Sequence, residues 1–172
     1  MTQLLNKIAQ PRILVTLTLA SIAVFASLFH ALGNLAKVSG GMGILDFEYG
    51  YDTTRVAEVF GSYGEAGMSI YSRIQLLDLI NPALYALVLA GWIRALWPTS
   101  PLWLAGLPFL AAVGDYTENL TLFIIANDFP LVSDPLVATS AAIGLVKHAL
   151  LGASFIALAA SLVHRLRDQT PL

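Results

Sequence analysis

The sequence predicts an all-α fold, a four-helix antiparallel bundle that crosses a membrane. Two observations carry this prediction. Of the 172 residues, 57% are hydrophobic and only 12% are charged, and the apolar residues gather in four long stretches. A soluble domain carries roughly a quarter charged residues, and a soluble molecule with so much apolar surface would aggregate. The length suits a single domain, and the stretches cover residues 13–32, 69–97, 102–126 and 136–163.

Each stretch is long enough for one helical span, because a hydrocarbon core of about 30 Å takes roughly 20 helical residues. Backbone polar groups find no water partners in lipid, so each span is expected to be a helix. The first stretch follows Lys7 and Arg12 and in this respect is like a signal peptide. Its apolar run exceeds the usual length of about 7–15 residues, and we therefore interpret it as a retained anchor.

The Lys and Arg residues beside the spans predict an orientation, because cytoplasmic loops carry an excess of them. One side carries Lys7, Arg12, Arg94, Arg165 and Arg167. The other side carries Lys37, Arg55 and Arg73, together with most of the acidic residues. We therefore expect a cell-membrane protein with both termini in the cytoplasm and residues 33–68 as a long outward loop.

Within the loop 33–68, a short amphipathic helix is expected to begin at a cap formed by Asp52 or Thr53 and to stop at Gly61. Residues 46–52 alternate acidic and other side chains like a calcium-binding loop, but Ala57 stands where such a loop needs its closing Glu. The sequence therefore predicts no metal site, and it leaves the identity of any cofactor open.

Composition limits the partners. The net charge of −2 argues against nucleic acid, because phosphate binding needs a basic patch. The chain has no cysteine, which excludes thiol redox chemistry and iron–sulfur ligation by cysteine. The lipid bilayer is the expected partner, with a lipid or a cation as the candidate ligand. A homo-oligomer or a larger membrane complex is the candidate assembly.

Ionisable and amide side chains within the spans form one layer. Such groups cost several kcal/mol in a membrane unless they are paired or hydrated, and so they are candidates for function. With a rise of about 1.5 Å per residue, those of the last three spans lie roughly 10–18 Å from the outer ends of their helices. The layer consists of Asp78, Asn81, Asp115, Glu118, Asn119, Lys147 and His148.

The helical spacing of these residues predicts a common pocket. On the second span, polar and aromatic residues recur every seven positions and form a slowly drifting stripe. On the third span, the spacing i, i+3 and i+4 places three polar residues on one face. The predicted pocket residues are Tyr71, Asp78, Asn81, Tyr85, Trp92, Asp115, Glu118, Asn119, Lys147 and His148.

Two further patterns concern helix packing. On the fourth span, Ala149, Ala153, Ala157 and Ser161 are predicted to form a ridge of small residues suited to helix contact, with Lys147 on the far side of the helix. Pro82, in the second span, is expected to kink its helix and to free the carbonyl one turn back, and Pro108 to do the same in the third.

Two groups of residues in and before the second and third spans form a recognisable pattern. The groups are Gly61-x-x-Gly64-Glu65 followed by Tyr71, Asp78, Pro82 and Tyr85, and Asp115-x-x-Glu118-Asn119. The pattern resembles a group of small four-span bacterial membrane proteins of unassigned function. The resemblance implies the four-span architecture and no particular activity.

The charges of the layer lead to several functional hypotheses. Three carboxyl groups face at most Lys147 and His148, so that one carboxyl stays protonated or the site attracts a cation. The leading hypothesis is a binding protein or membrane-complex subunit that holds a cation or an amphiphile headgroup. One alternative is a membrane-embedded enzyme that uses a carboxyl pair for acid–base chemistry on a lipid, with Asp115, Glu118, Lys147 and His148 as catalytic groups. Others are a proton- or cation-coupled transporter, and a purely structural salt-bridge network between helices.

Overall fold

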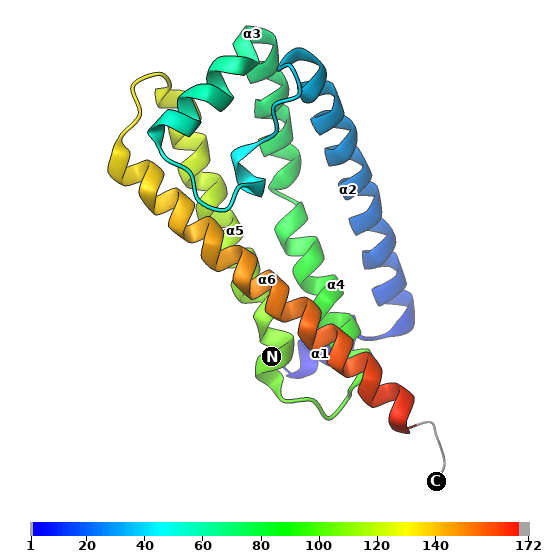
Figure 1. Cartoon of the computed structure of the whole chain (residues 1–172). Helices are drawn as coiled ribbons and strands as arrows, with labels where there is room; N and C mark the ends of the chain where they lie inside the picture. Colours follow the sequence, from blue (N-terminus) through cyan, green and yellow to red (C-terminus); the bar gives the residue numbers. More distant parts are fainter. Residues whose placement is uncertain (1, 169–172) are drawn as a thin grey trace.

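The computed structural model of the chain describes residues 2–168, which form helices and no strand (Figure 1). The all-α prediction is therefore confirmed. The elements in order are α1 (Thr2–Ile8), α2 (Pro11–Val38), the 3-10 helix η1 (Leu45–Phe47), α3 (Thr53–Asp78), α4 (Asn81–Leu96), α5 (Leu102–Asp128) and α6 (Asp134–Asp168).

Four helical segments are long and apolar enough to cross a membrane: Pro11–Val38, Thr53–Leu96, Leu102–Asp128 and Asp134–Asp168. The second of these combines α3 and α4. The segments lie side by side in the molecule (Figure 1), and large apolar side chains are exposed on their outer faces. Leu19 of α2 and Ile156 of α6, for example, are 62% and 73% exposed. An outer surface of this kind suits contact with lipid rather than water.

The expected loop 33–68 includes the end of one helix and the start of another. Helix α2 continues to Val38 and α3 begins at Thr53, so only residues 39–52 lie outside α-helices. The expected cap is present, because the Asp52 carboxylate accepts a hydrogen bond of 2.8 Å from the backbone N–H of Arg55. The expected stop at Gly61 is wrong. The interruption instead falls at Gly64, with φ 56° and ψ −169°.

The second span is interrupted next to Pro82, where a kink was expected, and Leu79 and Ile80 between the two helices keep right-handed helical backbone angles. Helix α3 ends at Asp78 and α4 begins at Asn81. Pro82 therefore occupies the first turn of α4, where its missing N–H costs no intrahelical hydrogen bond. Pro108, in contrast, lies inside α5 as expected. The break after Asp78 places the end of one helix and the start of the next within the polar layer.

Two buried apolar clusters hold the bundle, one at each end. The first combines the η1 segment with α3 and the adjoining ends of α5 and α6, and includes Phe60, Leu122 and Ala141. The second lies where α1 packs near α4, α5 and α6, and includes Ala105 and Ala157. Along α5 and along α6, the polar residues fall between members of the first cluster and members of the second. The polar layer is therefore enclosed between two apolar layers.

The φ of Gly64 gives a test of the α3 interruption. A side chain at this backbone conformation is strained by about 1–3 kcal/mol, so Gly64→Ala is expected to lower the free energy of unfolding by that amount. Gly61→Ala is the matched control, because a Cβ at either position meets no atom within 4 Å and only Gly64 has a positive φ. The control should be neutral, or stabilising by up to about 1 kcal/mol. Thermal unfolding in detergent measures both, and equal effects would contradict the assigned break.

Candidate functional site

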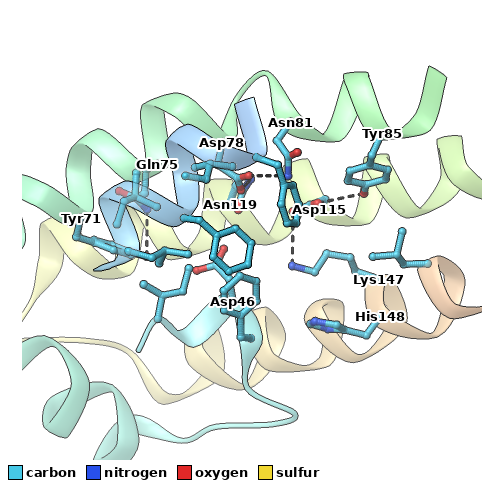
Figure 2. Close-up of a pocket in the computed structure, with 18 residues that line it drawn as sticks. Asp46, Tyr71, Gln75, Asp78, Asn81, Tyr85, Asp115, Asn119, Lys147 and His148 are labelled. Carbon is cyan, nitrogen blue, oxygen red and sulfur yellow. Dashed lines mark hydrogen bonds and ion pairs between the residues drawn. The ribbon is translucent and has the colours of Figure 1, made fainter. Parts of the chain in front are cut away.

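A cavity of about 150 Å³ lies within the polar layer (Figure 2). Side chains from α2, the η1 segment, α3, α4, α5 and α6 line it. Its polar lining residues are Asp46, Tyr71, Gln75, Asp78, Asn81, Tyr85, Asp115, Asn119, Lys147 and His148. Its apolar lining residues are Phe25, Leu28, Phe29, Leu32, Ile44, Phe47, Ile74 and Leu151.

A buried ion-pair network joins α5 to α6. The Lys147 Nζ atom is in close contact with Glu118 Oε2 and lies 3.5 Å from Asp115 Oδ1. All three side chains are nearly inaccessible, and Glu118 is fully buried. The helices approach closely here because position 144 of α6 is glycine, and a Cβ there would overlap the Glu118 carboxylate. Glu118 therefore sits between two helices, behind the cavity rather than on its wall.

Helix α4 joins this network through a tyrosine. The Tyr85 hydroxyl donates a hydrogen bond of 3.0 Å to Asp115 Oδ2 (Figure 2). Asp115 thus has one oxygen facing Lys147 and the other occupied by Tyr85. A carboxylate with a cation and a hydrogen-bond donor on its two oxygens is held in one orientation.

Asp78 has amide partners and, in the described part of the chain, no cation within ion-pair distance. Its Oδ1 accepts a hydrogen bond of 3.1 Å from Asn81 Nδ2, and its Oδ2 accepts one of 2.9 Å from Asn119 Nδ2. These bonds connect the last residue of α3 with the first residue of α4 and with α5. Because Asn81 donates to Asp78, its own Oδ1 is left as an acceptor. This buried oxygen has no hydrogen-bond partner among the described residues.

His148 presents an acceptor to the cavity. Its Nδ1 lies 2.7 Å from the Gly144 carbonyl oxygen. A carbonyl can only accept, so Nδ1 carries the hydrogen, and in the neutral ring Nε2 is the unprotonated nitrogen. The Tyr49 ring packs against the imidazole at a centroid distance of 5.0 Å. Lys147 and His148, although adjacent in sequence, both line the cavity.

The η1 segment carries a fourth carboxylate, Asp46, into the cavity (Figure 2). The segment is fixed on both sides. Before the segment, the Gly43 carbonyl accepts a hydrogen bond of 2.6 Å from the Tyr63 hydroxyl. After the segment, the Tyr51 hydroxyl donates a hydrogen bond of 2.8 Å to Ser140 Oγ. No hydrogen bond or ion pair within the described residues reaches the Asp46 carboxylate. The pKa of Asp46 is raised from 3.8 to about 7, chiefly by burial; Lys147 lowers the pKa, while Glu118, Asp78 and Asp115 contribute to raising it.

The structure brings most of the predicted pocket residues together. Eight of them line one cavity, namely Tyr71, Asp78, Asn81, Tyr85, Asp115, Asn119, Lys147 and His148. Glu118 lies behind this cavity. Trp92 lies away from the cavity, and its indole N–H donates a hydrogen bond of 3.2 Å to the Thr18 hydroxyl on α2.

Sequence reasoning missed Asp46 and the apolar wall supplied by α2. The available signal was the apolar run of Ile44, Leu45 and Phe47 around Asp46, because large apolar residues are most often found in the interior. The expected ridge on α6 is also wrong in part: Ala149 is exposed, whereas Lys147 is buried on the packed face with Gly144 and Ser154.

The unsatisfied groups of the site are mainly hydrogen-bond acceptors. Among residues 2–168 they comprise the Asp46 carboxylate, Asn81 Oδ1, Glu118 Oε1 and the Nε2 of the neutral His148 ring. Among the described residues, four carboxylates gather at the cavity and its rear wall, and Lys147 is the lysine among them. Arg73 is exposed and does not line the cavity. The site is therefore complementary to a group that brings positive charge and hydrogen-bond donors.

The close approach of α5 and α6 gives one prediction. Gly144→Ala is expected to lower the free energy of unfolding by about 1–3 kcal/mol, because the new methyl group overlaps the Glu118 carboxylate and forces the helices apart. Gly152→Ala, in the same helix with open space around it, is the control and should change stability little. Thermal unfolding of both variants in one detergent checks this. A Gly144→Ala protein as stable as the control would contradict the packing described.

The raised pKa of Asp46 gives a second prediction. The folded state binds a proton at this carboxyl more tightly than the unfolded state does. The corresponding stabilisation is therefore complete below the ordinary pKa of 3.8 and is lost as the pH rises through about 7. Wild type should consequently lose stability relative to Asp46→Asn between pH 4 and 8, as measured by unfolding at a series of pH values. The control is Glu65→Gln, at an exposed acid. A pH-independent difference between wild type and Asp46→Asn would contradict the prediction.

The resemblance to a group of small four-span bacterial membrane proteins stays a prediction. Comparison of the chain with protein-family models, with curated proteins and with solved structures finds no match. A proposal for the function of the cavity therefore depends on the chemistry of its lining residues.

Proposed function

We propose that the chain is a four-helix antiparallel transmembrane bundle of the bacterial inner membrane and that it binds a ligand carrying a protonated amine in its acidic cavity. The membrane arrangement is supported by the four apolar helical segments and by the cations at one set of their ends. In this arrangement both termini are cytoplasmic, and residues 39–52 with the first turns of α3 lie outside. The ends of α1 and α6 lie opposite that segment (Figure 1), which agrees with this orientation.

The surplus of acceptors is the observation that carries the binding proposal. Within residues 2–168, Asn81 Oδ1 is buried without a hydrogen-bond partner, and the Asp46 carboxylate enters the cavity without a cation at ion-pair distance. Leaving such acceptors unpaired costs free energy, and an ammonium group supplies three donors and a positive charge. Aromatic side chains of the wall, such as Tyr85 and Phe29, add cation–π attraction, worth about 0.5–2 kcal/mol.

The size of the cavity limits what enters it. A cavity of about 150 Å³ holds roughly a benzene-sized group. A small amine or an amine-bearing headgroup fits this volume, and a whole lipid does not. The site therefore suits either a free organic cation or the polar end of a longer molecule.

The geometry gives less support to the enzymatic and transport alternatives. An acid–base pair of Asp115 and Glu118 needs both carboxyl groups at the substrate, but Glu118 is fully buried behind the wall and in contact with Lys147. A transporter needs a path through the bundle, and the apolar cluster that includes Ile93 and Ala105 fills the bundle beyond the cavity. Binding without passage is the function that this arrangement favours.

Stabilisation by butylamine tests the proposal. Wild-type protein in detergent, at a pH where butylamine is protonated, should be stabilised in proportion to the logarithm of its concentration, and butanol should have no such effect. Asp78→Asn removes a carboxylate that lines the cavity and is expected to weaken butylamine binding about tenfold or more, because a charged hydrogen bond is worth roughly 1.5–3 kcal/mol.

Two further variants make this experiment decisive. Asp46→Asn removes a carboxylate that has no hydrogen bond to any of the described residues, so it should weaken binding without loss of a structural contact. Glu65→Gln, at an exposed acid outside the cavity, should bind butylamine like wild type. Equal stabilisation by butylamine and butanol, or equal binding in all four proteins, would refute an amine site at this cavity.

A further inference from the structure

The cavity is open on the side between α2 and α6. These helices diverge toward the end of the molecule that carries the η1 segment, which lies between them (Figure 1). Three cavity-lining side chains on this side are half-exposed: Phe25 and Phe29 of α2, and Phe47 of η1. Lining residues that are themselves exposed mark the mouth of the cavity. This mouth faces sideways from the bundle, toward the surroundings of the helices.

An apolar surface continues from this mouth along α2. A shallow groove on α2 is lined by Ser21, Ile22, Phe25, Ala26 and Phe29, so it shares its two phenylalanines with the cavity. Four of these five lining residues are apolar. The polar end of the site and this apolar track are therefore one continuous surface, with charge inside the bundle and hydrocarbon contacts outside.

A second apolar groove meets the cavity on the other side of Phe29. It lies between α2 and residues 41–47, and it shares Phe29, Leu32, Ile44 and Phe47 with the cavity lining. The apolar surface around the mouth is thus not an isolated patch. It surrounds the opening of a site whose interior is rich in carboxylates.

We propose that the ligand is a long-chain amine taken from the bilayer, with its ammonium group in the cavity and its hydrocarbon chain along α2 in the groove of Phe25, Ala26 and Phe29. The inference rests on the proposed amine-binding function and names the class of molecule bound. The small volume of the cavity admits only the head of such a molecule, and the continuous groove accepts the rest. A phosphate beside the amine is disfavoured, because Asp46, Asp78 and Asp115 would repel it.

Photolabelling in phosphatidylcholine nanodiscs tests the position of the chain. The probe is dodecylamine with a diazirine near the end of its chain, and dodecanol with the same group is the neutral control. The amine should label α2 between Ser21 and Phe29 in preference to the groove on the outer face of α5 and α6, which includes Val113 and Val146. Excess butylamine should reduce the labelling, because it competes for the cavity. Dodecanol should label both grooves alike.

A pair of tryptophan variants tests the groove itself. Ala26→Trp fills the groove on α2 and is expected to lower dodecylamine labelling of α2 about tenfold. A reduction of this size corresponds to roughly two methylene groups of the chain that are no longer buried in the groove. Val146→Trp places the same side chain on the opposite outer groove and should leave that labelling unchanged. Equal labelling in the two variants would overturn the inference.

The outcomes separate this inference from the function on which it rests. If butylamine stabilises the protein but dodecylamine labels α2 no more than dodecanol does, the chain position is wrong and the amine site stands. If neither amine binds, both proposals fail. If α2 is instead joined to α2 of a second copy on illumination, the groove is a subunit interface and the inference is overturned.

Discussion

Lys147 is the charge around which the bundle is organised. It is buried between α5 and α6, against Glu118 and Asp115, and Asp115 is held in turn by Tyr85 of α4. Removing one member of a buried ion pair leaves an uncompensated charge, at a cost of roughly 3–5 kcal/mol. The helices meet closely enough for this network only because position 144 lacks a side chain. The relative placement of α4, α5 and α6 therefore depends on the network around Lys147.

The same network divides the acids of the site into two sets. Glu118 and Asp115 are engaged by Lys147, whereas Asp78 and Asp46 have no cation within ion-pair distance in the described part of the chain. The structural and the ligand-binding interpretations of the polar layer are thus not exclusive. The rear of the layer fixes the helices, and its front presents acceptors to the cavity. One lysine cannot neutralise both sets, and this is why the front attracts a positive group in the function that we propose.

The sequence predicted the polar layer more closely than the segments that close it. The depth of each polar residue follows from a rise of about 1.5 Å per residue once the spans are located, and the shared face of Asp115 and Asn119 follows from their spacing. The packed face of α6 could not be predicted from the sequence, because alanines such as Ala149 suit contact with lipid as well as contact with another helix. The inward course of residues 39–52 depends on Tyr51 and Tyr63, whose partners are distant in sequence. The end of α3 at Asp78 likewise depends on amide partners from two other helices.

The walls of the cavity differ in what holds them, and this difference favours one side for the entry of the ligand that we propose. Helices α4, α5 and α6 are joined around the site by ion pairs and buried hydrogen bonds, and opening them would expose charges without partners. Helix α2 contributes apolar side chains to the cavity, such as Phe25 and Leu28. Displacing these contacts costs only apolar packing, which a hydrocarbon chain in the same place restores. A ligand arriving from the side of α2 therefore crosses the least costly wall, and the chain that follows its headgroup replaces the contacts that its entrance removed.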